Sequence, residues 1–111
     1  MGKMSVKVWG VKVGEIERTL YGHFIEHLGR CVYGGVISKI SGSHKQLLFH
    51  TNVINAVQKI RCPILRWPGG NFASAYHWMD GVGPIGERPQ HINYIWGGFE
   101  PNRFGTDEFL E

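Results

Sequence analysis

The stretch ILRWPGGNF, residues 64–72, places a short apolar run directly before a proline and two glycines. An apolar run bounded by Pro and Gly is typical of a buried strand that leads into a loop. In α/β proteins the loops after the carboxyl ends of strands carry much of the binding chemistry. Asn71, a polar side chain near Trp67 and Phe72, is therefore a candidate ligand-binding residue, although a tight turn with an incidental Asn fits the same letters.

The residues before this stretch predict a second strand and a helix. Apolar residues recur at i, i+4 and i+7 over 52–60, the spacing of an amphipathic helix that Thr51 or Asn52 can cap. The segment 19–25 is largely apolar and rich in β-forming residues, and it predicts an earlier buried strand. A strand, a helix and the strand at 64–67 form a βαβ unit, which implies parallel strands joined by a right-handed crossover. The sequence therefore predicts the α/β class.

The remaining segments give weaker signals. Residues 5–13 alternate polar and apolar side chains and predict a half-exposed strand. Residues 38–50 predict no firm structure, and residues 68–104 are rich in Gly and Pro and predict loops. Thr106 begins a sequence typical of a capped helix start, with acids near the positive end of the helix dipole. The chain ends about one turn later, in the middle of that helix.

Charge and composition exclude several classes of protein. The net charge of +3 comes from 12 Lys and Arg against 9 Asp and Glu, and the basic residues are scattered, so no nucleic-acid partner is expected. No apolar run reaches the ~20 residues that cross a bilayer, and residues 1–7 lack the features of a signal peptide. We therefore expect a cytoplasmic protein with no membrane partner. Cys31 and Cys62 form no CxxC motif and are expected to be reduced packing residues.

Glycine and aromatic residues are frequent, with 16 Gly among 111 residues and 13% aromatic side chains. Gly-rich loops that carry Trp, Tyr and Phe suggest a site that stacks on flat ligand faces, as sugar sites do. By residue type alone, aromatic side chains are more often packing residues than sugar platforms, and acids are most simply solvated or capping groups. The residues concerned are Tyr76, Trp78, Trp96, Asp80, Glu87, Glu100, Asp107 and Glu108.

The motif HFIEH, residues 23–27, spells an inverted zinc-protease pattern. That chemistry needs both histidines on one face of a helix, whereas the residues before this motif favour a strand. Histidines hydrogen-bonded in a packed loop are the better interpretation, and no metal is expected. Glu26 is different, because a carboxylate just after a buried strand is costly unless it is hydrogen-bonded or used. It is either a ligand-binding residue or a structural partner of Arg30 or Arg66.

Four blocks of sequence occur in order along the chain: YGHFIEHLGR at 21–30, LRWPGGNF at 65–72, YHWMDGVGP at 76–84 and NRFGTDEF at 102–109. Together they resemble the N-terminal region of the α-L-arabinofuranosidases of glycoside hydrolase family 51. The resemblance implies a (β/α)₈ TIM barrel with an accessory β-sandwich. It also implies an intracellular enzyme that removes terminal non-reducing α-L-arabinofuranosyl residues from arabinan, arabinoxylan or oligosaccharides with retention of configuration.

On this resemblance, residues 1–17 hold a strand of the accessory β-sandwich and residues 18–111 hold about the first two βα units of the barrel. Glu26 and Asn71 are implied ligands of arabinose hydroxyls, and Trp96 is an implied wall of the sugar subsite. Arg66 is implied to orient one of the acids at the site. No cofactor is implied. Two positions depart from the family pattern, Met79 and Pro101, and both lie in predicted loops.

A retaining glycosidase needs two carboxylates ~5–5.5 Å apart, and a complete barrel needs about 250 residues. In the family this catalytic pair follows later strands, so no catalytic residue is expected within residues 1–111. The expected partners are an arabinofuranoside substrate and the remainder of the barrel, on the same or a second polypeptide, with homo-oligomers possible. A non-catalytic sugar-binding or scaffold fragment is the alternative. Zinc proteolysis through HFIEH is a distant third interpretation.

Overall fold

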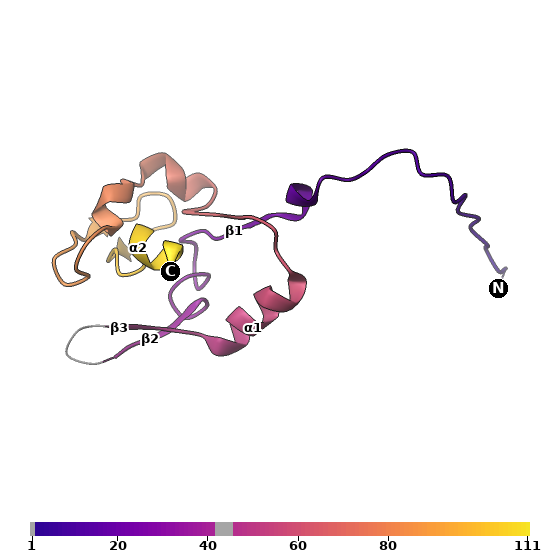
Figure 1. Ribbon diagram of the computed structural model, residues 1–111. Coiled ribbons are helices and arrows are strands. Elements are labelled where there is room, and N and C mark those ends of the chain that lie inside the picture. The colour runs from indigo at the N-terminus through magenta and orange to yellow at the C-terminus, as the bar shows by residue number, and fades with distance from the viewer. Residues whose placement is uncertain (1, 42–45) are drawn as a thin grey trace.

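The computed structural model describes residues 2–41 and 46–111 of the chain. An extended N-terminal segment, residues 2–17, leads away from a folded body that contains all the helices and strands described (Figure 1). Residues 5–13 form no paired strand within the described chain, because this segment pairs with no other described residue and its apolar side chains are exposed, so the predicted strand stays a prediction. A strand is stabilised by backbone hydrogen bonds to a neighbouring strand, which alternation of side chains cannot supply.

Two short parallel strands position the rest of the fold. Strand β1 (His23–Phe24) pairs with β4 (Leu65–Arg66), with His23 opposite Leu65. This parallel pair confirms the predicted relation between the two strands. The first strand is much shorter than predicted, because Arg18–Tyr21 forms the 3₁₀-helix η1 instead, and both side chains of β1 are exposed. Their exposure follows from the sheet having only two strands, with neither edge paired further among the described residues.

A hairpin and a helix connect the two parallel strands. Strand β2 (Ile37–Ser41) pairs antiparallel with β3 (Gln46–Phe49), and α1 (Thr51–Ile60) follows. The hairpin was not predicted, and residues 42–45 of the stretch expected to lack structure lie outside the described residues. Helix α1 confirms the helix predicted over 52–60. Its N-cap is His50, with no side-chain capping bond, so neither Thr51 nor Asn52 caps it as predicted.

The segment after β4 contains more structure than the predicted loop. Two 3₁₀-helices, an antiparallel hairpin and a short helix follow in order: η2 (Asn71–Ala75), η3 (Trp78–Gly81), β5 (His91–Ile92), β6 (Phe99–Glu100) and α2 (Thr106–Leu110). Helix α2 confirms the predicted helix start. Its first turn is held by Glu108, whose carboxylate accepts the Gly105 N–H at 2.8 Å, while the Thr106 hydroxyl donates to Trp78 O.

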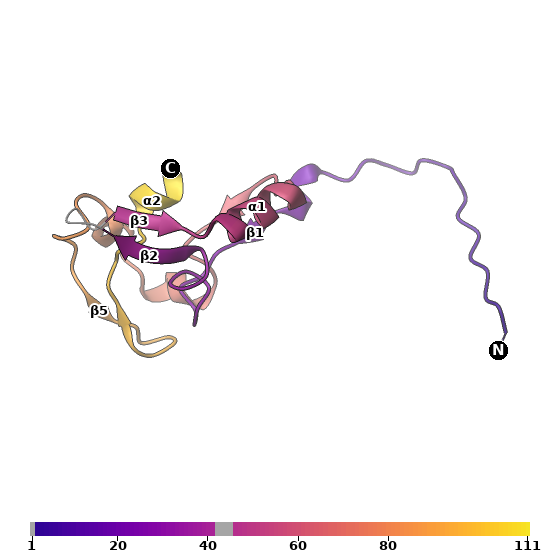
Figure 2. The ribbon, with the colours of Figure 1, turned by 90° about the horizontal axis from the view of Figure 1, so that it is seen from below.

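The buried core is small. It is centred on Val32, Ile37 and Phe104, with Phe49, Trp67 and Phe109 among the side chains packed around it. Figure 2 shows α2 and the β2–β3 hairpin on the same side of the body, where these residues meet. No residue of α1 is buried, so its apolar face is not covered by the described residues. Within the described ranges, no helix is long and apolar enough to cross a bilayer.

The exposed apolar surface predicts association in solution. Ile60 of α1 is 61% exposed, and Ile64, Leu20 and Phe24 beside the parallel pair are more than half exposed. Apolar surface of this kind and unpaired strand edges favour contacts between molecules. We expect the purified 111-residue chain to form concentration-dependent oligomers in sedimentation velocity experiments. A strictly monomeric species with a cooperative thermal transition over the same concentrations would contradict this expectation.

Candidate functional site

Glu26 leaves the carboxyl end of β1 and lies against the loop that follows β4. The Ile25 N–H donates to Arg66 O at 2.9 Å, which extends the parallel pairing up to Glu26. Gly69 has a φ of +119°, and a Cβ built on it would lie 2.2 Å from the Glu26 Cβ. No side chain fits in that space. The loop therefore needs a glycine at position 69, where its backbone packs directly on Glu26.

The Glu26 carboxylate is held by donors from two distant segments. Its Oε1 accepts the Phe72 backbone N–H at 2.9 Å and the Trp96 indole N–H at 3.1 Å. The Phe72 amide lowers the pKa of Glu26, burial opposes this, and Trp96 with the Gly70 and Asn71 amides lowers it further. The net shift is downward, so Glu26 is an anionic acceptor of hydrogen bonds near neutral pH. Neither Arg30 nor Arg66 is its partner, which removes the structural alternative considered for it.

This pKa shift gives a prediction for low pH. Because the folded-state pKa lies below the ordinary value of 4.5, the carboxylate contributes stability that is present above pH 4.5 and is lost as the pH falls through the lowered value. The Trp96 indole N–H bonded to Glu26 should report this step in an NMR titration, with a midpoint below 4.5. A midpoint at or above 4.5 would contradict the hydrogen bonds described. In Glu26→Gln the step should be absent.

Trp96 is placed by the turn between β5 and β6. The Asn93 side-chain oxygen accepts the N–H groups of Ile95 and Trp96 at 3.2 and 2.9 Å, an Asx turn that fixes the backbone there. Trp96 as a residue remains 41% exposed while its indole N–H is bonded to Glu26. Sequence reasoning missed Asn93. The signal that could have found it is an Asn followed three residues later by Trp and then by two glycines.

Asn71 and Arg66 flank the same loop. Asn71 is exposed and begins η2, one residue before the amide that binds Glu26. The Arg66 guanidinium donates to Gly69 O at 2.6 Å and lies 4.9 Å from the centre of the Phe24 ring. Among the described residues it forms no ion pair with an acid, so its role in orienting a carboxylate stays a prediction. Within the described residues, Arg66 braces the loop that carries Asn71.

A buried polar network lies behind Glu26. The His27 Nδ1 is 2.7 Å from Glu100 Oε2, and the Trp67 indole N–H donates to His27 Nε2 at 3.0 Å. Because an indole only donates, Nε2 is the acceptor and Nδ1 carries the proton shared with Glu100. Tyr33 donates its hydroxyl to the other Glu100 oxygen at 2.6 Å. The His27 ring also stacks on Phe72, with ring centres 4.7 Å apart.

This network bears on two interpretations of the sequence, zinc binding by HFIEH and a solvated Glu100. Both ring nitrogens of His27 are engaged by protein groups, and His23 belongs to an exposed strand rather than a helix, so HFIEH does not present a zinc-binding pair. The interpretation of a histidine hydrogen-bonded in a packed loop is confirmed for His27. The expectation that Glu100 is solvated is wrong, because its residue is 4% exposed. No local sequence signal marks it, since its partner His27 is 73 residues away.

A second buried charge ties the end of the segment together. Arg88 binds both oxygens of Glu108, at 2.6 and 2.8 Å, and donates to the backbone oxygens of Gly83 and Asn102. A bidentate pair of this kind fixes geometry as well as charge. It holds the start of α2 against the loop before β5, in addition to the expected capping bond, in which the Gly105 N–H donates to Glu108. Arg88 was not predicted.

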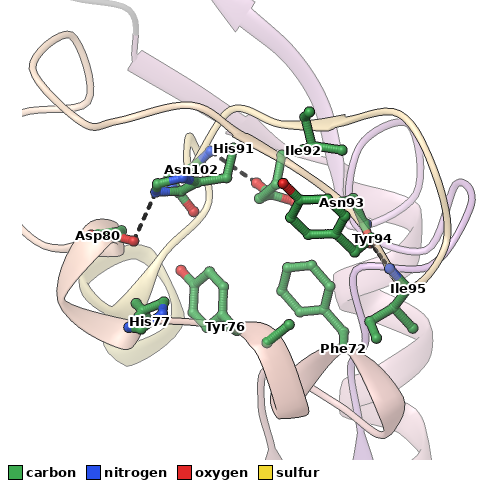
Figure 3. A pocket seen from close by; sticks show the side chains of 12 residues that line it. Phe72, Tyr76, His77, Asp80, His91, Ile92, Asn93, Tyr94, Ile95 and Asn102 are labelled. Atoms are coloured by element: carbon green, nitrogen blue, oxygen red, sulfur yellow. Dashed lines mark hydrogen bonds and ion pairs between the residues drawn. The ribbon is translucent and has the colours of Figure 1, made fainter.

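A hollow of about 190 Å³ lies beside Glu26 but does not include Glu26, Asn71 or Trp96. Figure 3 shows its lining, which comes from η2, η3 and the β5–β6 region. The predicted ligand residues therefore do not line this hollow. We assign the candidate site to Glu26, Asn71 and Trp96 because the hydrogen bonds to the Glu26 carboxylate and its lowered pKa place the polar chemistry there.

The sequence was compared with protein families and with known proteins. The sequence profile of the family described as "Alpha-L-arabinofuranosidase 1 domain" matches residues 56–111. The chain is 46% identical over 100 residues to an intracellular exo-alpha-(1->5)-L-arabinofuranosidase of Halalkalibacterium halodurans, covering 90% of this chain and 20% of the relative. It is 50% identical over 97 residues to an intracellular exo-alpha-L-arabinofuranosidase of Bacteroides ovatus, covering 86% of this chain and 19% of the relative.

Solved structures agree with the sequence relatives. A GH51 alpha-L-arabinofuranosidase from Thermotoga petrophila superposes with a TM-score of 0.74 at 52% identity, over 86% of this chain and 20% of that protein. A GH51 arabinofuranosidase from Xanthomonas axonopodis pv. citri gives a TM-score of 0.76 at 44% identity, over 87% of this chain and 20% of that protein. The chain thus spans about a fifth of the length of the relatives that it matches.

Proposed function

The chain belongs to the α-L-arabinofuranosidases of glycoside hydrolase family 51, as an N-terminal portion, and from this we propose that it supplies the sugar-binding part of such an enzyme. The complete enzyme would be an intracellular, retaining glycosidase that removes terminal non-reducing α-L-arabinofuranosyl residues from arabinosides. Relatives named as intracellular arabinofuranosidases support the activity and the location.

One observation carries the proposal. Glu26 and Trp96, which are 70 residues apart in sequence, are joined by a hydrogen bond of 3.1 Å at the end of a parallel strand pair. A carboxylate that is anionic and already oriented can accept hydrogen bonds from sugar hydroxyls. An exposed indole face beside it can pack on the apolar face of a sugar ring. Asn71, with one donor and one acceptor group on its amide, lies in the same loop and would bind a further hydroxyl. Arg66 would act by bracing this loop.

The fold supports the same assignment. We propose that β1 and β4 are the first two strands of a (β/α)₈ barrel, and that residues 1–17 add a strand to an accessory β-sandwich. The parallel pairing of His23 with Leu65 and the exposed apolar side chains around it favour further strands on both sides. The relatives are about five times longer, so we place the catalytic carboxylate pair in the other four-fifths of the enzyme. That remainder is the first partner proposed for this chain.

The test is to restore the missing part. Residues 1–111 would replace the matching segment of the Bacteroides ovatus relative, which is 50% identical over this region. The resulting fusion should hydrolyse an aryl α-L-arabinofuranoside, whereas residues 1–111 alone should not. A folded fusion that binds arabinosides without hydrolysing them would favour the non-catalytic sugar-binding alternative. A folded fusion that neither binds nor hydrolyses them would refute the proposal.

A further inference from the structure

The β5–β6 hairpin is tied at two points to the segment that follows β1. In the turn of the hairpin, the Trp96 indole N–H donates to Glu26 at 3.1 Å. In strand β6, the Glu100 carboxylate accepts a hydrogen bond from Nδ1 of His27 at 2.7 Å. Glu26 and His27 are consecutive residues, whereas Trp96 and Glu100 are four positions apart. Two adjacent residues therefore hold different parts of the hairpin, so the position of one contact constrains the other.

The contact between His27 and Glu100 is the better protected of the two. Its side chains are 1% and 6% exposed, whereas Trp96 is 41% exposed. A hydrogen bond is electrostatically stronger away from water, and a hydrogen bond to a carboxylate is among the stronger kinds. We therefore expect the buried contact to fix the hairpin, and the exposed contact between Trp96 and Glu26 to depend on it.

The direction of the hydrogen bonds in this buried network is set. The Trp67 indole donates to Nε2 of His27, which leaves Nδ1 of the same ring to donate to Oε2 of Glu100. The other oxygen of Glu100 accepts the Tyr33 hydroxyl at 2.6 Å and the Asn102 backbone N–H at 2.9 Å. Both oxygens thus face donors. The network requires a side chain at position 100 that accepts on both sides, which a carboxylate does and an amide does not.

The hairpin itself links Glu100 to Trp96. Glu100 pairs with His91 in the antiparallel ladder, and nearer the turn the Asn93 N–H donates to Gly98 O at 2.9 Å. The Asn93 side-chain oxygen then accepts the backbone N–H of Trp96 at 2.9 Å. Because these bonds join the strand to its turn, a displacement of Glu100 would carry the indole with it.

We propose that His27 and Glu100 are positioning residues of the sugar subsite, which set the place of the Trp96 indole relative to the Glu26 carboxylate. Both side chains are buried, so they act through the hairpin and not by touching a sugar. The part of this inference that concerns sugar rests on the proposed function. The effect of the pair on the contact between Trp96 and Glu26 is a property of the 111-residue chain alone. A subsite held in this way is set before the sugar arrives.

The first experiment follows the Trp96 indole N–H by NMR in the ¹⁵N-labelled 111-residue chain. In Glu100→Gln, either orientation of the amide brings a donor against a donor, at His27 or at the Asn102 N–H. We expect the Trp96 signal to lose its hydrogen-bonded shift and the proton to exchange with water about tenfold faster or more. Asp80→Asn is the matched control. It alters another contact between a carboxylate and a histidine of the same hairpin, but its partner segment is η3, so the Trp96 signal should not change.

The second experiment uses the fusion enzyme and an aryl α-L-arabinofuranoside. Glu100→Gln should raise KM about tenfold and leave kcat within about threefold, because an indole wall contacts the sugar in the ground state and in the transition state alike. Trp96→Phe, which lacks the indole N–H, should raise KM as well. In the Trp96→Phe background, Glu100→Gln should change KM by no more than about twofold, because the residue through which it acts is already altered. Asp80→Asn should match the parent.

The Arg88 Nε–H, which donates to Gly83 O, reports whether a variant is folded. A folded Glu100→Gln chain with an unchanged Trp96 signal would overturn the proposal, and multiplicative effects of Glu100→Gln and Trp96→Phe on KM would show a general structural role. An inactive fusion, with Trp96 released in Glu100→Gln, would refute the proposed function and leave the positioning of the indole standing.

Two variants of His27 decide the matter if Glu100→Gln does not fold. His27→Asn keeps an N–H donor near the place of Nδ1, whereas His27→Leu fills the space without one. We expect the Trp96 N–H to stay bonded to Glu26 in the first variant and to be released in the second. Equal behaviour of the two, unfolding of both included, would show that the pair serves the fold and does not specifically place Trp96.

Discussion

Replacing Glu26 by Gln in the fusion enzyme is expected to lower kcat/KM for an aryl α-L-arabinofuranoside about 100-fold, or about 2.7 kcal/mol. The carboxylate receives the Phe72 amide and the Trp96 indole on one oxygen. Gln can keep that oxygen as the acceptor, so the local backbone should hold. It loses the negative charge and replaces the second acceptor by a donor, which removes one charge-assisted bond to a sugar hydroxyl, worth about 1.5–3 kcal/mol.

The control for this prediction is Glu87→Gln. Glu87 is exposed and has the same side chain, so its substitution tests for the effect of one lost charge without a change at the site. It should leave kcat/KM within about twofold of the parent. If Glu26→Gln were equally harmless while the fusion is active, Glu26 would be a purely structural acceptor. If Glu26→Gln and Glu26→Asp both lowered kcat/KM, the length of the side chain would matter as well as its charge.

The fold shows which sequence patterns carry structural information. The parallel relation of the two strands was predictable, because both apolar runs are local and each is bounded by residues that stop a strand. Helix α1 was predictable for the same reason, since its apolar spacing lies within ten residues. Residues 5–13 stay unpaired within the described chain, because alternation describes the faces of a strand but not its partner. The β2–β3 hairpin was missed because pairing between segments is not encoded by either segment alone.

The candidate site was predictable only in part. Position after a strand singled out Glu26, and the PGG turn singled out the loop of Asn71. Nothing in composition or spacing could bring Trp96 to within 3.1 Å of Glu26, and the family resemblance implied only that both residues belong to the sugar subsite. The buried role of Glu100 was missed altogether, because an isolated acid in a polar loop looks solvated until its distant partners are known. Long-range contacts of this kind are invisible to local patterns.

Phe72 and Asn93 connect the candidate site to the hollow beside it. The Phe72 backbone N–H donates to Glu26, the Phe72 ring stacks on His27, and the same residue lines the hollow. Asn93 lines that hollow and also fixes the turn that presents Trp96. Residues that line the hollow therefore also position the carboxylate and the indole of the candidate site.

Replacing Gly69 by Ala is expected to be the most destabilising single change in the loop, at about 3–5 kcal/mol. Two costs combine. The backbone φ of +119° is one that residues with a Cβ rarely adopt, and the added Cβ would lie 2.2 Å from the Glu26 Cβ and 2.5 Å from its Cα. The nearest atoms belong to the backbone and the start of the side chain, so they cannot rotate away. The loop must move, and Glu26 would lose the Phe72 amide.

Gly83→Ala separates these two costs. Gly83 also has a positive φ, +83°, but a Cβ there would meet nothing within 4 Å, so its substitution carries the backbone cost without the clash. We expect about 1–2 kcal/mol for Gly83→Ala in urea unfolding followed by tryptophan fluorescence at low micromolar concentration. The excess for Gly69→Ala then measures its contact with Glu26. Equal losses for the two variants would show that the loop relaxes freely, and that close packing of the PGG turn does not hold Glu26 in place.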